Sequence, residues 1–105
     1  MRIIKLDASG WKTLLDFYEA LLVALEAPHW HGRNINALID SMVYGGINGI
    51  EPPYTVLVTN LTDVPKAVCE EVSYTVSAIQ EARQERFENQ GVAVEVSISA
   101  PELAH

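Results

Sequence analysis

The sequence lacks several features that define large classes of protein. Cys69 is the only cysteine among 105 residues, so no internal disulfide can form and the disulfide framework of a secreted domain is excluded. No run of about 18 apolar residues occurs, and the start of the chain, MRIIKLDASGW, shows no secretory signal. Repeats and Ser/Gly-rich linkers are also missing. We therefore expect one soluble, cytoplasmic domain over residues 1–105.

The chain also carries few positive charges. Seven Lys and Arg residues stand against fourteen Asp and Glu residues, which gives a formal net charge of −7. Such a chain repels nucleic acid and anionic membranes, so neither is expected as a direct partner. A basic protein would be attracted to it, although acidity can also serve only to keep a small protein in solution.

The first part of the chain predicts a strand followed by a helix. Residues 2–6, RIIKL, are short and β-branched, and the turn after them offers a helix cap at Asp7, Ser9 or Gly10. The helix is predicted to end before Pro28, because a proline pushes the preceding residue away from helical angles. Its core-facing stripe is predicted to contain Trp11, Leu14, Leu15, Tyr18, Leu21, Leu22 and Leu25.

A second strand and a long helix are predicted in the other half. The apolar run YTVLVTN, residues 54–60, is typical of a central strand covered on both faces. Asp63 and Pro65 favour a helix start, and Gly91 favours a C-terminal cap after a helix that runs to about Glu88. The residues predicted to face inward are Val68, Val72, Thr75, Val76 and Ile79.

A third strand completes the predicted fold. Residues 92–98, VAVEVSI, alternate with the period of a strand that buries Val92, Val94, Val96 and Ile98. Strands separated by helices indicate right-handed crossovers and a parallel sheet. The predicted fold class is α/β, a small three-stranded parallel sheet packed with helices in the order βααβαβ.

The stretch HWHGRNINALID, residues 29–40, is polar beside its apolar neighbours. If residues 34–44 are helical, an advance of about 100° per residue sorts them onto two faces. The inward face holds Ile35, Leu38, Ile39 and Met42. The outward face holds Arg33, Asn36, Ala37, Asp40 and Tyr44. Asn34 is predicted to cap this helix, and Gly32 is predicted to let the loop before it turn sharply.

This segment resembles the signature of the barstar family of intracellular ribonuclease inhibitors, which reads aromatic–aromatic–Gly–x–Asn–Leu–Asp–Ala–Leu–x–Asp. The matching positions are Trp30, His31, Gly32, Asn34, Asn36, Ala37, Leu38 and Asp40. The order of strands and helices is similar to that family over nearly the whole chain. The resemblance implies a three-stranded parallel sheet whose loop and second helix plug the active site of a basic ribonuclease or nuclease toxin.

The resemblance also implies roles for particular residues. Asp40 would act as a phosphate mimic in a cationic cleft. Trp30 and His31 match an aromatic pair that rests on the enzyme, and Glu81 matches a peripheral acid. Alternatives are that Trp30 packs on its own domain and that Glu81 joins a charge ladder within its helix. The residues expected to contact a partner are Trp30, His31, Arg33, Asn34, Asn36, Ala37, Asp40, Tyr44 and Glu81.

Three positions depart from the family pattern. Asn36 replaces the first acid of the helix, so this position can accept a hydrogen bond but brings no charge. Arg33 adds a positive charge, and Ile39 replaces an aromatic residue. These departures suggest a divergent partner, such as a toxin nuclease whose site is less basic or differently shaped.

Two other classes of function compete with an inhibitor. A binding or regulatory module for a different basic protein would share all these features. A metal-dependent hydrolase could use His29, His31 and Asp40 as ligands, but no second cysteine or acidic cluster completes a metal shell, and no serine lies in a nucleophile elbow. We therefore expect a monomer that is not an enzyme and has no cofactor or metal.

Overall fold

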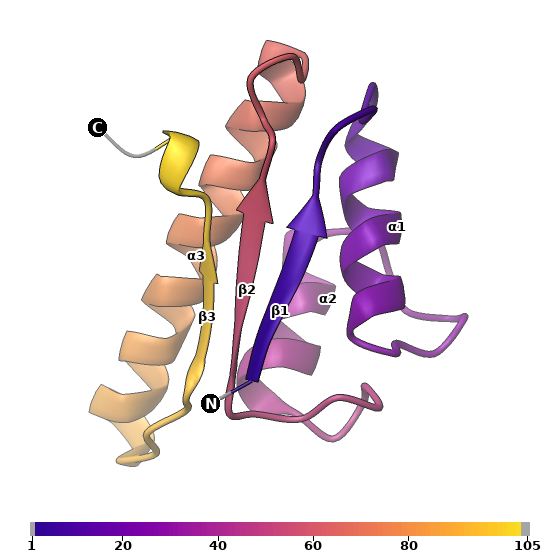
Figure 1. Ribbon diagram of the computed structural model, residues 1–105. Helices are drawn as coiled ribbons and strands as arrows, with labels where there is room; N and C mark the ends of the chain where they lie inside the picture. The colour runs from indigo at the N-terminus through magenta and orange to yellow at the C-terminus, as the bar shows by residue number, and fades with distance from the viewer. Residues whose placement is uncertain (1, 104–105) are drawn as a thin grey trace.

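The computed structural model describes residues 2–103 and forms one three-stranded parallel sheet with its helices on one face (Figure 1). In spatial order the strands are β1 (Arg2–Asp7), β2 (Tyr54–Thr59) and β3 (Val96–Ser99). The helical elements are α1 (Leu14–Ala24), α2 (Ile35–Ile39), the π-helical turn η1 (Asp40–Tyr44), α3 (Lys66–Gln90) and the 3-10 helix η2 (Pro101–Leu103). Because η1 continues α2, the predicted βααβαβ order and the α/β fold are confirmed.

The central strand β2 is buried on one face only. The sheet residues turned toward the helices are buried, and they include Leu6, Tyr54, Val56, Val58, Val96 and Ile98. On the other face, which is turned to the viewer in Figure 1, Leu57 is only half-buried and Thr55 bonds to Ser97 through their hydroxyls at 2.9 Å. The prediction that both faces are covered was therefore wrong, because the second face alternates small polar residues with apolar ones.

Strand β3 is shorter than predicted. The register pairs Val96 with Tyr54, the first residue of β2, so residues 92–94 extend beyond the point where β2 begins. Pro52 and Pro53, which precede β2, have no amide to donate to a ladder. Val92 is accordingly exposed and lies outside the strand, contrary to the prediction that it faces the core.

Helix α1 begins later than predicted because its cap lies at Thr13. The Asp16 carboxylate accepts hydrogen bonds from the amides of Lys12 and Thr13 at 2.7 and 3.1 Å, and these bonds lower its pKa. The Thr13 hydroxyl accepts from the Asp16 amide, which completes a capping box. Asp7 does not cap this helix, and its carboxylate instead accepts from Ser9 and Asn60.

The buried stripe of α1 differs from the prediction near the start of the helix. Leu14 and Leu15 were predicted to face the core, but both lie in the first turn and are exposed. Phe17, which that prediction omitted, is fully buried and packs against Trp11 with their ring centroids 5.6 Å apart. The other buried residues of the helix are Tyr18, Leu21 and Leu22, as predicted.

Helix α3 is the longest element and spans the height of the sheet (Figure 1). Its start at Pro65 has no side-chain cap, so the expected capping role of Asp63 was wrong. Its end at Gly91 is a left-handed cap, as predicted, with a φ of 68°. Val68, Val72, Thr75 and Ile79 are buried as predicted, whereas Val76 is half-buried. Within residues 2–103 no helix is both long and apolar enough to span a membrane.

The Tyr54 hydroxyl allows the cost of an unpaired polar group in the core to be measured. Its hydroxyl is buried and has no hydrogen-bond partner among residues 2–103. Burial and the nearby charge of Glu51 raise the pKa of this phenol. Because an unsatisfied buried hydroxyl is costly, we expect Tyr54→Phe to keep the free energy of unfolding or raise it by up to about 1 kcal/mol in urea denaturation. A clear loss of stability would show that the hydroxyl is satisfied in solution, for example by water.

Candidate functional site

The second helical segment is held at both ends by specific hydrogen bonds. The Asn34 side-chain oxygen accepts from the Ala37 amide at 2.8 Å, so Asn34 caps α2 as predicted. From Asp40 the helix widens into the π-helical turn η1, which closes where the Gly45 amide donates to the Asp40 carbonyl at 3.1 Å. Such π turns occur frequently at functional sites. Asp40 therefore lies where the regular helix changes pitch.

The two faces of this segment are arranged as predicted. Leu38 and Met42 are fully buried in the hydrophobic core, and Ile35 and Ile39 are half-buried. The outward residues Arg33, Asn36, Asp40 and Tyr44 are exposed, and Ala37 is half-buried among them. Within residues 2–103 the Asp40 carboxylate has no hydrogen bond or ion pair. A solvent-facing acid is thus displayed on a capped helix.

The side chain of His31 lies inside the domain, although the resemblance had placed it on the outer surface beside Trp30. His31 is only 3% exposed, with Nδ1 2.7 Å from the Gly32 carbonyl oxygen and Nε2 2.8 Å from the Ser41 hydroxyl. A carbonyl oxygen only accepts, so Nδ1 donates, and in the neutral ring Nε2 accepts from Ser41. The ring therefore ties the loop to the π-helical turn instead of projecting toward a partner.

Ser41 is a site residue that sequence reasoning missed, because a serine beside outward-facing Asp40 gives no sign of being buried. Ser41→Ala removes the partner of His31 Nε2 and leaves a buried ring nitrogen unsatisfied. We expect a loss of about 1–3 kcal/mol in the free energy of unfolding, measured by urea denaturation. Ser41→Thr keeps a hydroxyl and is the matched comparison. Equal stability of wild type and Ser41→Ala would mean that the His31 bond contributes nothing.

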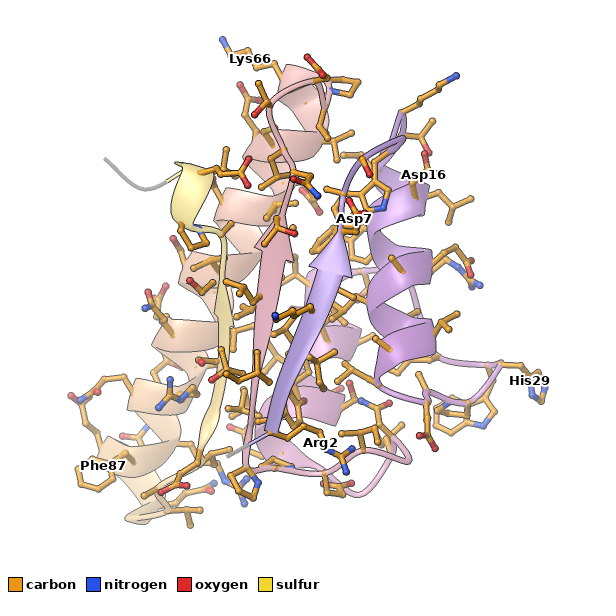
Figure 2. The ribbon with its side chains drawn as sticks, in the orientation of Figure 1. Arg2, Asp7, Asp16, His29, Lys66 and Phe87 are labelled. Carbon is orange, nitrogen blue, oxygen red and sulfur yellow. The ribbon has the colours of Figure 1, made fainter. Side chains whose placement is uncertain are left out.

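The loop before α2 presents two further side chains to solvent. Trp30 is 65% exposed, so it does not pack mainly on its own domain. His29 lies at the outer tip of this loop and points away from the helices (Figure 2). Because His31 is buried with both ring nitrogens bonded, the two histidines do not converge. Residues 2–103 contain no group of three or more potential metal ligands.

Arg33 forms an ion pair within its own domain. Its guanidinium contacts the Glu19 carboxylate of α1 at 2.5 Å, and both side chains are nearly half exposed. The pair offsets the positive charge that distinguishes this loop from the family pattern. It also joins the loop to α1.

Arg86 is a second residue that sequence reasoning missed. It donates from Nη1 to the Val43 carbonyl at 2.6 Å, and its guanidinium lies 4.8 Å from the centre of the Tyr44 ring. A cation is favourable at the C-terminal end of a helical segment, where carbonyl groups lack partners. Arg86 thus fixes the end of η1 from a helix that is distant in sequence, which explains why no local pattern indicated it.

Glu81 is exposed on α3, the helix that packs beside α2. The alternative charge ladder does not form around it, because Arg83 donates to the Val94 carbonyl at 3.1 Å and Gln84 donates to Glu88. Within the part of the chain that the structure describes, the Glu81 side chain has no hydrogen bond or ion pair. The exposed carboxylate of Glu81 is therefore carried by α3, which lies on the same face of the sheet as α2 (Figure 1).

A comparison with protein families gives one match that covers most of the chain. The family model described as Barstar (barnase inhibitor) matches residues 1–99. No curated protein matches the chain. The matched range contains the whole sheet, α1, α2, η1 and α3, and all the residues expected to contact a partner.

Proposed function

The chain belongs to the barstar family, whose members are inhibitors and not enzymes, and from this premise we propose that it binds a ribonuclease-type toxin and occludes the active site. We further propose that it acts in the cytoplasm as an immunity-type protein. Its contact surface consists of the loop around Trp30, the outward face of α2 and η1, and Glu81 on α3. Within this surface Asp40 is the central anchor.

The observation that carries the proposal is the exposed and unpaired carboxylate of Asp40 on a capped helix. A ribonuclease cleft gathers cationic side chains that bind RNA phosphate, and a carboxylate can occupy that position with charge-assisted hydrogen bonds. Because Asn34, Arg86 and the His31–Ser41 bond already hold the segment, little conformational entropy is lost on binding. The formal charge of −7 favours association with a basic enzyme.

The other surface residues have distinct proposed roles. Trp30 provides a large exposed aromatic side chain, the kind of residue that is enriched at the energetic centre of interfaces. Asn36 lies one turn from Asp40 and supplies hydrogen-bonding groups without charge. Ala37 and Tyr44 complete the contact face. Two of the expected residues, His31 and Asn34, support the contact face indirectly. They hold the loop and the start of α2 in place.

Titration against ribonucleases tests this proposal. The purified chain is added to barnase-type ribonucleases, including any that is encoded beside its own gene, and RNA cleavage and calorimetric binding are measured. We expect complete inhibition of at least one enzyme at a one-to-one ratio. If no ribonuclease is bound while a different basic protein forms a stoichiometric complex, the proposal is wrong and the chain is a binding module of another kind.

A further inference from the structure

An open hollow of about 550 Å³ lies between α1, α2 and α3, beside the proposed contact surface. We call it the Glu71 hollow. Its walls include Tyr18, Arg33, Asn34, Asn36, Glu71 and Tyr74. Asn36 belongs both to this wall and to the outward face of α2, where Asp40 follows one turn later. The hollow is therefore continuous with the surface that presents Asp40.

Glu71 is the one uncompensated charge in the wall of the hollow. Its carboxylate is half-buried and accepts a hydrogen bond from the Tyr18 hydroxyl of α1. Burial and this hydrogen bond raise the pKa of Tyr18, so the phenol keeps its proton and remains the donor. A carboxylate offers about four acceptor positions, and among residues 2–103 Glu71 forms no ion pair. Acceptor capacity thus remains for a cation that enters from outside.

Arg33, the cation in the wall of the hollow, does not neutralise Glu71. Arg33 is paired with Glu19, so its charge is already offset by an acid of α1. Neutralising Glu71 with Arg33 would leave Glu19 alone. The hollow therefore keeps a net negative charge in the free protein, which favours a cationic ligand over an anionic one.

Tyr74 adds an aromatic surface next to this charge. It lies three residues after Glu71 on α3, a spacing that makes the two side chains neighbours on the helix surface. Tyr74 is 65% exposed and lines the hollow. A planar guanidinium can stack on such a ring while its N–H groups bond to a carboxylate, whereas an ammonium group lacks the plane and the fork.

We propose that the Glu71 hollow is a subsite for an arginine side chain of the bound ribonuclease, with the guanidinium bonded to Glu71 and stacked on Tyr74. This inference rests on the proposed function, because it names a group of the enzyme that the contact surface engages. The Glu71 carboxylate would also compensate for the first helix acid of the family, which is Asn36 in this chain. The negative charge lost from α2 is provided instead by α3, across the hollow from Asn36.

A small probe tests the subsite without any ribonuclease. N-acetyl-arginine amide is titrated into the full chain labelled with nitrogen-15, and saturable NMR shifts are expected at Asn36, Glu71 and Tyr74. The citrulline analogue, which has a similar shape but no charge, should give no saturable shifts. Glu71→Gln is expected to raise the dissociation constant about tenfold and Tyr74→Ala about threefold.

Two residues of α3 serve as matched controls for these substitutions. Glu70 is an exposed acid paired with Lys66, and Phe87 is an exposed aromatic residue near the other end of the helix. Glu70→Gln and Phe87→Ala should leave the dissociation constant of the arginine probe unchanged. If the probe gives no saturable shifts at the hollow, or if the controls weaken it equally, the inference is overturned.

The same four variants are then measured against a ribonuclease that the chain inhibits. Weaker binding by Glu71→Gln and Tyr74→Ala, with unchanged binding by the two controls, supports the inference. Wild-type affinity in both hollow variants overturns it and leaves the proposed function standing. If the arginine probe binds in the hollow but no ribonuclease binds the chain, the proposed function fails, and the assignment of the arginine to such an enzyme fails with it.

Discussion

Asp40→Ala is expected to abolish tight binding to the ribonuclease while the domain stays folded. The side chain is exposed and makes no hydrogen bond or ion pair within residues 2–103, so its removal breaks nothing in the free protein. In the complex its loss would leave the cations of the enzyme cleft buried without a partner, which costs about 2–5 kcal/mol or more. The complex of barstar with barnase is itself a known example of this effect, so that size is carried over from the family.

Stability and affinity separate in this variant. Alanine is the best helix former, and a surface change of this kind moves the free energy of unfolding by about 0.5 kcal/mol at most. Calorimetry of the complex should therefore show a large loss of affinity, whereas thermal melting of the free domain should show almost no loss of stability. Asp40→Asn keeps the shape of the side chain and removes only the charge, which isolates the electrostatic part.

A matched control comes from another exposed acid. Asp63 precedes α3, caps no helix, and is distant in sequence from the proposed surface. Asp63→Ala lowers the total negative charge by the same amount, so it should slow association slightly and leave the dissociation rate unchanged. Equal affinity of wild type and Asp40→Ala would remove the central anchor of the proposed function.

Local periodicity was sufficient to predict the topology and the orientation of the candidate surface. The alternation at Val96 and Ile98 and the spacing from Val68 to Ile79 indicated which faces are buried. Asn34 was predictable as a cap because the residue and the amide that it accepts from are only three positions apart. The exposure of Asp40 was predictable from the helical advance of about 100° per residue. Features that depend on residues close in the chain were therefore accessible from the sequence.

Contacts between distant segments were not accessible in this way. The Arg33–Glu19 pair and the Arg86–Val43 bond join residues 14 and 43 positions apart, and no local pattern specifies them. Buried His31 bonds to Ser41, which lies ten residues away in the π-helical turn η1. The late start of α1 had a simpler cause, since the Thr13–Asp16 capping box competed with the earlier turn residues.

Gly32 requires a different explanation from the one its sequence context suggested. It is absent from the glycines with positive φ, so it is not needed for a left-handed turn. A Cβ atom at this position would instead lie 2.9 Å from Asn34 Nδ2 and 3.2 Å from Ala37 Cβ. Both neighbours belong to the capping interaction, because the Asn34 side chain accepts from the Ala37 amide. Space at the start of α2 is what demands glycine here.

Gly32→Val should therefore lower stability and affinity together. The added side chain pushes against the Asn34 cap, and overpacking of this kind costs about 1–3 kcal/mol, which corresponds to a fall in melting temperature of several degrees. Asn34→Ala removes the cap bond without adding atoms and is expected to cost about 0.5–2 kcal/mol, whereas Asn34→Ser keeps a capping oxygen. Binding should weaken in Gly32→Val and Asn34→Ala because displacement of α2 moves Asp40. An unchanged melting temperature for Gly32→Val, measured beside these two variants, would show that the loop has room for a side chain.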